Sequence, residues 1–259
     1  MRRWWILFLF VVCLGCQPQW TFAVLGDASI GQSGENDPTV LARAVEAINR
    51  TDAELVLFSG DLVYGRTVDG EETRRQYAKA KDTLRGLRAR LLIVPGNHDV
   101  DGARGEEFWN LRFARVPWTH EHRGWTFIGL NTEEKAPRRI QFDRQKDWLT
   151  QQLMRSKTPE HMVVLMHQPV WPHLAPGNRY HSTPRPDLHD LFKEYKVVGV
   201  FSGHEHTFQQ EQRDGVLYVT SGGAGAELLP GGQYHFLLVH VRGRRLEVEK
   251  IDLSATKQR

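Results

Sequence analysis

The sequence predicts an α/β fold of two packed mixed β-sheets flanked by helices. Five apolar runs without helical periodicity alternate with amphipathic segments along most of the chain. Such short runs are typical of parallel strands that are buried on both faces. Near the C-terminus the pattern changes, because residues 215–220, 234–241 and 246–253 are strand-like segments separated by glycine-containing turns. Such spacing predicts antiparallel hairpins after the parallel units.

Each of the five apolar runs is followed by residues that can bind a hard metal ion. The runs are residues 22–25, 55–58, 91–94, 162–166 and 197–201. The residues that follow them are Asp27, Asp61, Asn97 with His98 and Asp99, His167, and His204 with His206. In open α/β sheets, ligands collect where such strands end. Because the side chains offer oxygen or imidazole and no thiol, the pattern predicts a metal centre for hard or borderline cations.

Amphipathic segments between the strands predict helices. Asp37 and Pro38 are typical of a helix start, with Asp37 as the N-cap and Pro38 in the first helical position. A second helix is expected over residues 71–88 and a third over residues 141–154. The residues expected to point inward are Val40, Leu41, Ala44, Val45, Ile48, Tyr77, Ala80, Leu84, Phe142, Trp148, Leu149 and Leu153. Residues 125–130 predict one more strand.

The composition suits one large α/β domain and does not indicate a nucleic-acid partner. The chain has 259 residues, of which 40% are hydrophobic, so it can form a substantial core. Its 34 Lys and Arg residues against 31 Asp and Glu residues give a formal charge of +3. These basic residues are spread along the chain and form no basic stripe of the kind that nucleic-acid binders carry.

The N-terminus predicts an export signal over residues 1–16, followed by one domain over residues 17–259. Arg2 and Arg3 precede an apolar run at residues 4–14, which is too short to span a membrane. Cys13 and Cys16 resemble the end of a bacterial lipoprotein signal, in which Cys16 is lipidated. We therefore expect a membrane-anchored lipoprotein of the cell envelope that faces the periplasm or the outside. An ordinary signal peptide and an uncleaved anchor are the alternatives.

Three of the candidate ligands have features suited to a dinuclear centre. The carboxylate of Asp61 follows Gly60 and has two oxygens, which can bridge two cations about 3.5–4 Å apart. His204 and His206 would point to opposite sides of a straight strand. In a loop after Gly203 both side chains can reach one site.

These residues, in this order, resemble the calcineurin-like metallophosphoesterases. The motifs are Gly-Asp, Gly-Asp-x-x-Tyr, Gly-Asn-His-Asp, Val-x-x-His and Gly-His-x-His, and they extend from Asp27 to His206. The resemblance implies the four-layer α/β/β/α metallophosphoesterase sandwich and a hydrolase of phosphate esters with two metal ions. Bound cations would polarise the phosphoryl oxygen and activate water for in-line attack.

Two positions indicate the purple acid phosphatase branch, of the tartrate-resistant acid phosphatase type. Most calcineurin-like enzymes have Asp-x-His in the first motif, whereas this chain has Ser29 in place of that histidine. Tyr64 matches the position at which purple acid phosphatases supply a tyrosinate to ferric iron. The resemblance therefore implies Fe(III) with Fe, Zn or Mn(II). The branch usually has glycine where this chain has Ser29, and an ordinary strand-end tyrosine is the alternative for Tyr64.

The resemblance also implies a role for each ligand and its neighbours. One metal would be held by Asp27, Asp61, Tyr64 and His206, and the other by Asp61, Asn97, His167 and His204. His98 would approach the substrate, where it protonates the leaving oxygen or orients the phosphate. Asp99 would hold the His98 ring in one tautomer.

Residues 171–186 follow the His167 motif and are rich in proline, histidine and aromatic residues. We expect them to form a loop over the site, in which His173, Arg179 and His181 are candidates to contact the substrate. A solvated loop is the alternative for each of them. Residues 221–225 are glycine-rich but lack the ending of a P-loop, so we expect a tight turn near the site.

Three functions fit the sequence. The first is hydrolysis of small-molecule phosphate monoesters. The second is a phosphodiesterase of the same superfamily, acting on a cyclic nucleotide or an envelope diester. The third is a non-catalytic envelope lipoprotein that retains the fold as a binding module.

Overall fold

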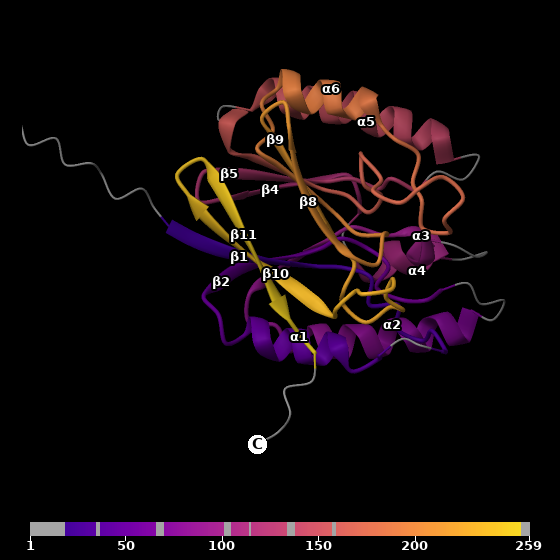
Figure 1. The fold of residues 1–259 in the computed structure, drawn as a ribbon. Coiled ribbons are helices and arrows are strands. Elements are labelled where there is room, and N and C mark those ends of the chain that lie inside the picture. The colour runs from indigo at the N-terminus through magenta and orange to yellow at the C-terminus, as the bar shows by residue number, and fades with distance from the viewer. Residues whose placement is uncertain are drawn as a thin grey trace, which may run out of the picture.

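Two mixed β-sheets pack face to face, with helices on their outer faces (Figure 1). The computed structural model describes residues 19–34, 37–65, 70–100, 105–113, 115–133, 138–156 and 159–254. The predicted export signal, residues 1–16, lies outside these ranges. Within them no helix is long and apolar enough to cross a membrane.

The first sheet has five strands in the order β11-β10-β1-β2-β3. Its strands are β1 (Gln19–Leu25), β2 (Ala53–Phe58), β3 (Arg90–Ile93), β10 (His235–Arg242) and β11 (Arg245–Asp252). β1, β2 and β3 run parallel, while β10 pairs antiparallel with both β1 and β11. The first three predicted parallel strands and the C-terminal hairpin therefore share one sheet.

The second sheet has six strands in the order β4-β5-β6-β7-β9-β8. Its strands are β4 (Trp118–His122), β5 (Trp125–Gly129), β6 (Met162–Leu165), β7 (Gly199–Ser202), β8 (Phe208–Arg213) and β9 (Val216–Ser221). One prediction is wrong here, because β9 does not form a hairpin with β10. It pairs antiparallel with β8 and parallel with β7, so it belongs to the other sheet.

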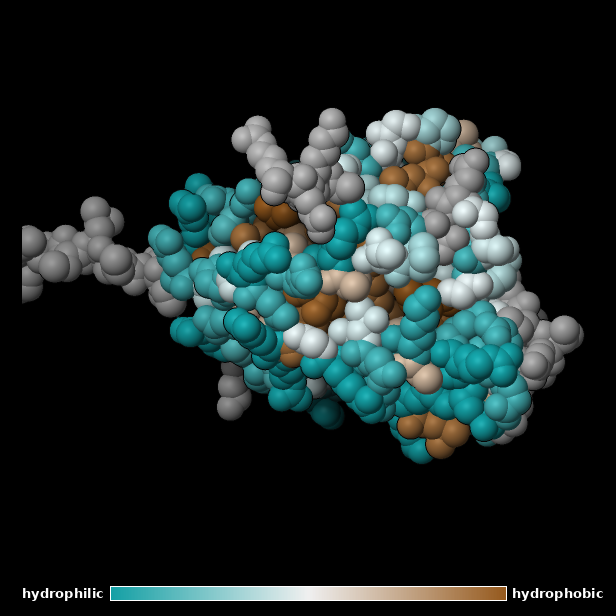
Figure 2. All heavy atoms as spheres, turned by 90° about the horizontal axis from the view of Figure 1, so that it is seen from below, coloured by the Kyte–Doolittle hydropathy of each residue, from teal (hydrophilic) through white to brown (hydrophobic). Residues whose placement is uncertain are grey.

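The helices lie in two outer layers and at the site end of the sheets. The elements are α1 (Val40–Ile48), α2 (Gly70–Leu84), α3 (Asn97–Val100), α4 (Gly105–Arg112), α5 (Arg138–Arg155), the short 3₁₀ helix η1 (Pro159–His161) and α6 (Pro186–Glu194). α1 and α2 cover the first sheet, and α5 and α6 cover the second (Figure 1). On the side of α1 and α2 the surface is mostly hydrophilic, as expected of helices that bury one face (Figure 2).

Three layers of apolar side chains separate these four layers of secondary structure. Alternate residues of β1 serve two of them. Phe22 and Val24 face the layer between the sheets, whereas Ala23 and Leu25 face α1 and α2. Between the sheets the Phe22 ring packs edge-on against another phenylalanine, Phe201, with centroids 5.6 Å apart. The predicted four-layer α/β/β/α sandwich is therefore confirmed.

The helix ends differ from the predicted ones. α1 begins at Val40, and Asp37 precedes it by three residues. Asp37 Oδ1 accepts the backbone N–H of Thr39 at 2.9 Å, so it caps the turn before the helix. α2 ends at Leu84, four residues before the predicted end. Gly86 follows that end, and glycine is unfavourable in a helix interior. The predicted buried face of α1 is confirmed.

Candidate metal centre

The loops after β1, β2 and β3 and those after β6 and β7 meet at one edge of the molecule. The backbone N–H of Asp27 donates to the Gly60 carbonyl at 2.9 Å, which joins the loops after β1 and β2. The N–H of Gly203 donates to the His167 carbonyl at 2.9 Å, which joins the loops after β6 and β7. The candidate ligands thus come from loops that are held by neighbouring backbone.

Four of these loop positions have a left-handed backbone although none is glycine. Their φ angles are 62° at Asp27, 44° at Ser29, 53° at Asp61 and 69° at His204. Non-glycine residues adopt this conformation at a cost, and such positions cluster at functional sites. The bend at His204 also places residues 203–207 in a loop rather than a straight strand, which frees His204 and His206 from the alternation of a strand.

A compact group of four ligand atoms includes one carboxylate oxygen, Asp61 Oδ2. His204 Nδ1 lies 2.9 Å from Asn97 Oδ1 and 3.2 Å from His167 Nε2. His167 Nε2 lies 3.1 Å from Asn97 Oδ1 and 3.5 Å from Asp61 Oδ2. Donor atoms that share one cation at bonds of about 2.0–2.2 Å lie roughly 3 Å apart. The spacing of these four side chains therefore fits one metal ion.

The pKa values of the two histidines of this group are shifted in opposite directions. His167 is fully buried, and its Nδ1–H donates to the Ser59 carbonyl at 2.8 Å, so Nε2 faces the cluster. Burial lowers the pKa of His167, but the Asp61 carboxylate outweighs burial and raises it well above the usual value. Burial and the neighbouring His167 lower the pKa of His204 to about 3. The neutral His204 ring retains a lone pair for a cation.

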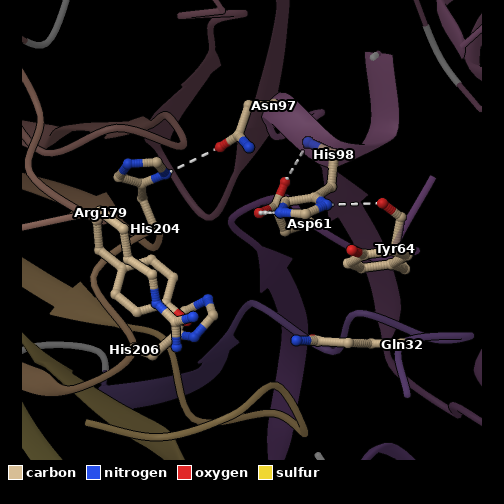
Figure 3. A pocket seen from close by; sticks show the side chains of 9 residues that line it. Gln32, Asp61, Tyr64, Asn97, His98, Arg179, His204 and His206 are labelled. Carbon is tan, nitrogen blue, oxygen red and sulfur yellow. Dashed lines mark hydrogen bonds and ion pairs between the residues drawn. The ribbon is translucent and has the colours of Figure 1, made fainter. Parts of the chain in front are cut away.

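A second set of donors lies beside the first. Asp27 is fully buried, and its Oδ1 lies 3.5 Å from His206 Nε2. The opposite nitrogen of His206, Nδ1–H, donates to the Glu227 carbonyl at 2.6 Å, so the ring orientation is fixed. Tyr64 and His206 line the same cavity as Asp61, and the Tyr64 hydroxyl points into it (Figure 3). One phenol, one imidazole and the carboxylates of Asp27 and Asp61 offer a donor set for a second ion.

His98 is held by the loop that carries Tyr64. Its Nδ1–H donates to the Tyr64 carbonyl at 2.6 Å, and its backbone N–H donates to Asp61 Oδ1 at 2.8 Å (Figure 3). His98 Nε2 lies 3.9 Å from Asp61 Oδ2 and belongs to the side chain that lines the cavity. The ring is therefore oriented so that Nε2 is the nitrogen available to a substrate.

The expectation that Asp99 orients the His98 ring is wrong. Asp99 is buried, and its carboxylate accepts backbone N–H groups of Leu62 at 3.2 Å, Val63 at 3.1 Å and Gly96 at 2.9 Å. Burial raises the pKa of Asp99 to about 7. Asp99 thus ties the loop after β3 to the loop after β2, and it positions the site through the backbone.

The loop over residues 171–185 contributes a wall of the cavity, but only one of its three predicted residues lies there. Arg179 lines the cavity, as does its neighbour Tyr180, which the sequence did not single out. His173 and His181 are not among the lining residues. His173 is exposed, and His181 Nδ1–H donates to a carbonyl within the loop.

Two further features of the cavity complete the site. Its volume is about 150 Å³, and its ninth lining residue is Gln32, which the sequence also did not single out. The Gln32 amide points into the cavity (Figure 3). Ser29 is buried and is not among the lining residues. The turn at residues 221–225 lies beside the site as expected, since the N–H of Ala224 donates to the Gly26 carbonyl at 3.0 Å.

Comparisons with known proteins agree with this geometry. The calcineurin-like phosphoesterase family model matches residues 21–208. A probable cyclic nucleotide phosphodiesterase from Ruthia magnifica is 22% identical over 72% of this chain and 76% of that protein. Purple acid phosphatase 21 from Arabidopsis thaliana is 27% identical over 79% of this chain and 49% of that protein.

The solved structure of the purple acid phosphatase PPD1 from yellow lupin (Lupinus luteus) has the same fold. It superposes with a TM-score of 0.68 at 16% identity, over 90% of this chain and 52% of that chain. The chain thus spans about half the length of these two plant phosphatases. The resemblance to the purple acid phosphatase branch is confirmed by these relatives. The chain belongs to the calcineurin-like phosphoesterases, hydrolases that act on phosphoester bonds.

Proposed function

We propose that the chain is a phosphomonoesterase with a dinuclear metal centre, similar to purple acid phosphatases. The observation that carries this proposal is the cluster of Asn97, His167 and His204 against Asp61, in a cavity that Tyr64 also lines. One ion would be held by Asp61, Asn97, His167 and His204. The other would be held by Asp27, Asp61, Tyr64 and His206.

Several side chains around the cavity could bind a phosphate ester or assist its hydrolysis. Cations held there would stabilise charge on the phosphoryl oxygens and make bound water a stronger nucleophile. His98 presents Nε2 to the cavity and can donate a proton to the leaving oxygen. Arg179 and Gln32 offer N–H donors to phosphate oxygens from two other walls. A small-molecule phosphate ester is therefore the proposed substrate.

The proposal is tested by turnover of two matched chromogenic esters. After loading with iron and with zinc or manganese, the purified protein should hydrolyse p-nitrophenyl phosphate with a higher kcat/KM than bis(p-nitrophenyl) phosphate. Turnover of the diester alone would contradict the proposed monoester preference. Turnover of neither ester by fully loaded protein would support a non-catalytic role.

A phosphodiesterase is the second candidate, and one relative favours it. The probable cyclic nucleotide phosphodiesterase from Ruthia magnifica matches this chain over 76% of its own length, unlike the longer plant phosphatases. Adding 2′,3′-cyclic and 3′,5′-cyclic AMP to the assay separates the two candidates. The diesterase proposal requires that kcat/KM for one of these cyclic nucleotides is higher than kcat/KM for the monoester.

We propose ferric iron at the ion that Tyr64 would bind. A phenol has an unperturbed pKa of about 10, and a trivalent cation ionises it more readily than a divalent one. The loaded protein should therefore show a visible phenolate-to-iron charge-transfer band, and Tyr64→Phe should abolish it. Tyr180→Phe is the matched control, because Tyr180 lines the same cavity and should leave the band in place. A colourless, fully active protein that holds only divalent ions would refute the ferric assignment.

A further inference from the structure

A buried carboxylate between two proposed ligands faces away from the metal cluster. Glu205 lies between His204 and His206 in the chain, and its side chain is fully buried. Its carboxylate accepts the backbone N–H of His173 at 3.1 Å on both oxygens and the N–H of Leu174 at 3.2 Å. The same short turn therefore directs two imidazoles to the metal site and one carboxylate to the loop over residues 171–185.

In addition to its contact with Glu205, that loop is held by hydrogen bonds between its own residues. At its base the N–H of Arg185 donates to the Val170 carbonyl at 2.9 Å. The Leu174 carbonyl accepts His181 Nδ1–H at 2.7 Å, and the N–H of His181 donates to the Asn178 carbonyl at 3.0 Å. Because these bonds join its two halves, fixing the loop at residues 173–174 also restrains the position of residues 179–181.

The restrained end of the loop lies over the site. The Tyr180 ring packs on the ring of His206 with centroids 4.2 Å apart. The Arg179 guanidinium lies 4.6 Å from the centre of the Tyr180 ring and pairs with Glu227 at 2.5 Å. In Figure 3 the Arg179 side chain stands beside the rings of His204 and His206, across the cavity from His98. These two loop residues are therefore the wall that a substrate meets.

We propose that Glu205 is a positioning residue that clamps the 171–185 loop to the metal-binding turn and so places Arg179 and Tyr180 for substrate binding. An apolar side chain here would leave two partly buried backbone N–H groups without their acceptor, which disfavours the closed loop. The part of the proposal that concerns substrate binding rests on the proposed phosphoesterase function.

The clamp is tested first by amide hydrogen exchange, which does not depend on activity. In the metal-loaded protein, Glu205→Ala should speed exchange at His173 and Leu174 and across residues 175–181. Glu205→Gln should leave exchange slow, because its amide oxygen can accept the same two N–H groups. Glu205→Asp keeps the charge but is one methylene shorter, so it should exchange quickly, and it replaces Glu205→Ala if that variant does not fold. Unchanged exchange in the Ala and Asp variants would overturn the proposal.

The second test separates positioning from loss of metal or fold. Glu205→Ala should raise KM for p-nitrophenyl phosphate about tenfold with a much smaller change in kcat. The reason is that a displaced Arg179 would no longer donate charge-assisted hydrogen bonds to the bound phosphate. Its metal content should match that of the unaltered protein. Arg179→Ala should raise KM in the unaltered protein but add little in the Glu205→Ala background, because both changes remove the same wall.

The clamp would be contradicted if the KM increases of Glu205→Ala and Arg179→Ala multiplied in the double variant. Loss of metal in both the Glu205→Ala and Glu205→Gln variants would also contradict it. If the unaltered protein hydrolyses no ester, the proposed function fails, whereas the exchange experiment still decides whether Glu205 holds the loop.

Discussion

Replacing Asp61 by asparagine is expected to abolish phosphoesterase activity, with a loss in kcat of about 10³-fold or more. Asp61 is 2% exposed, and its carboxylate is the anionic member of the cluster formed with His167 and His204. An asparagine keeps the shape but removes the charge and one of the two oxygens needed to bridge two cations. The variant should also bind less metal, which elemental analysis of the purified protein measures directly.

The control for Asp61→Asn is Asp82→Asn. Asp82 is exposed on α2 and pairs with Arg85 just after the end of that helix, so neutralising it changes the total charge equally without touching the site. The two variants should differ in activity and metal content while folding equally well by circular dichroism. Equal activity in both, at full metal occupancy, would contradict the assignment of Asp61 as the bridging ligand.

His98→Ala should have an effect that depends on the leaving group. If His98 Nε2 protonates the leaving oxygen, the loss in kcat should reach about 10²–10⁴-fold for an alkyl phosphate. It should be far smaller for p-nitrophenyl phosphate, whose phenolate leaves readily without a proton. The measurement is the dependence of log kcat/KM on the pKa of the leaving group, which should be steeper in the variant.

The control for His98→Ala is His240→Ala, on β10, where the imidazole pairs with Glu249 away from the site. This variant should show the unaltered slope. An equal loss for every leaving group in His98→Ala would mean that His98 orients the phosphate and does not transfer a proton.

The sequence was informative wherever an apolar run ended in a ligand-type side chain. The pattern identified the loops after β1, β2, β3, β6 and β7, and the structure places all five at one edge. Parallel strands buried on both faces are strongly patterned, and their carboxyl ends must meet at the same edge. The metal cluster could therefore be predicted without knowing any contact.

Features without periodicity could not be predicted in this way. β8 is an edge strand whose residues are half-buried or exposed, so it lacks the apolar alternation that predicts a strand. Because β8 could not be predicted, its pairing with β9 could not be predicted either. The resemblance implies that Asp99 orients the His98 ring, but in the turn of α3 the Asp99 carboxylate accepts backbone N–H groups, while His98 Nδ1–H donates to the Tyr64 carbonyl. In the 171–185 loop, nothing local distinguished Tyr180, which packs on His206, from His173, which is exposed.

The two sheets contribute chemically different halves of the candidate centre. All of its oxygen donors, Asp27, Asp61, Tyr64 and Asn97, follow strands of the first sheet, and all of its imidazoles, His167, His204 and His206, follow strands of the second. A cation bound there would be a cross-link between the sheets. The affinity of the centre for that cation would therefore depend on how the two sheets pack against each other. The contact between the rings of Phe22 and Phe201, which lie between the sheets, would influence the affinity through this packing. In such an arrangement the hydrophobic core is part of the metal site.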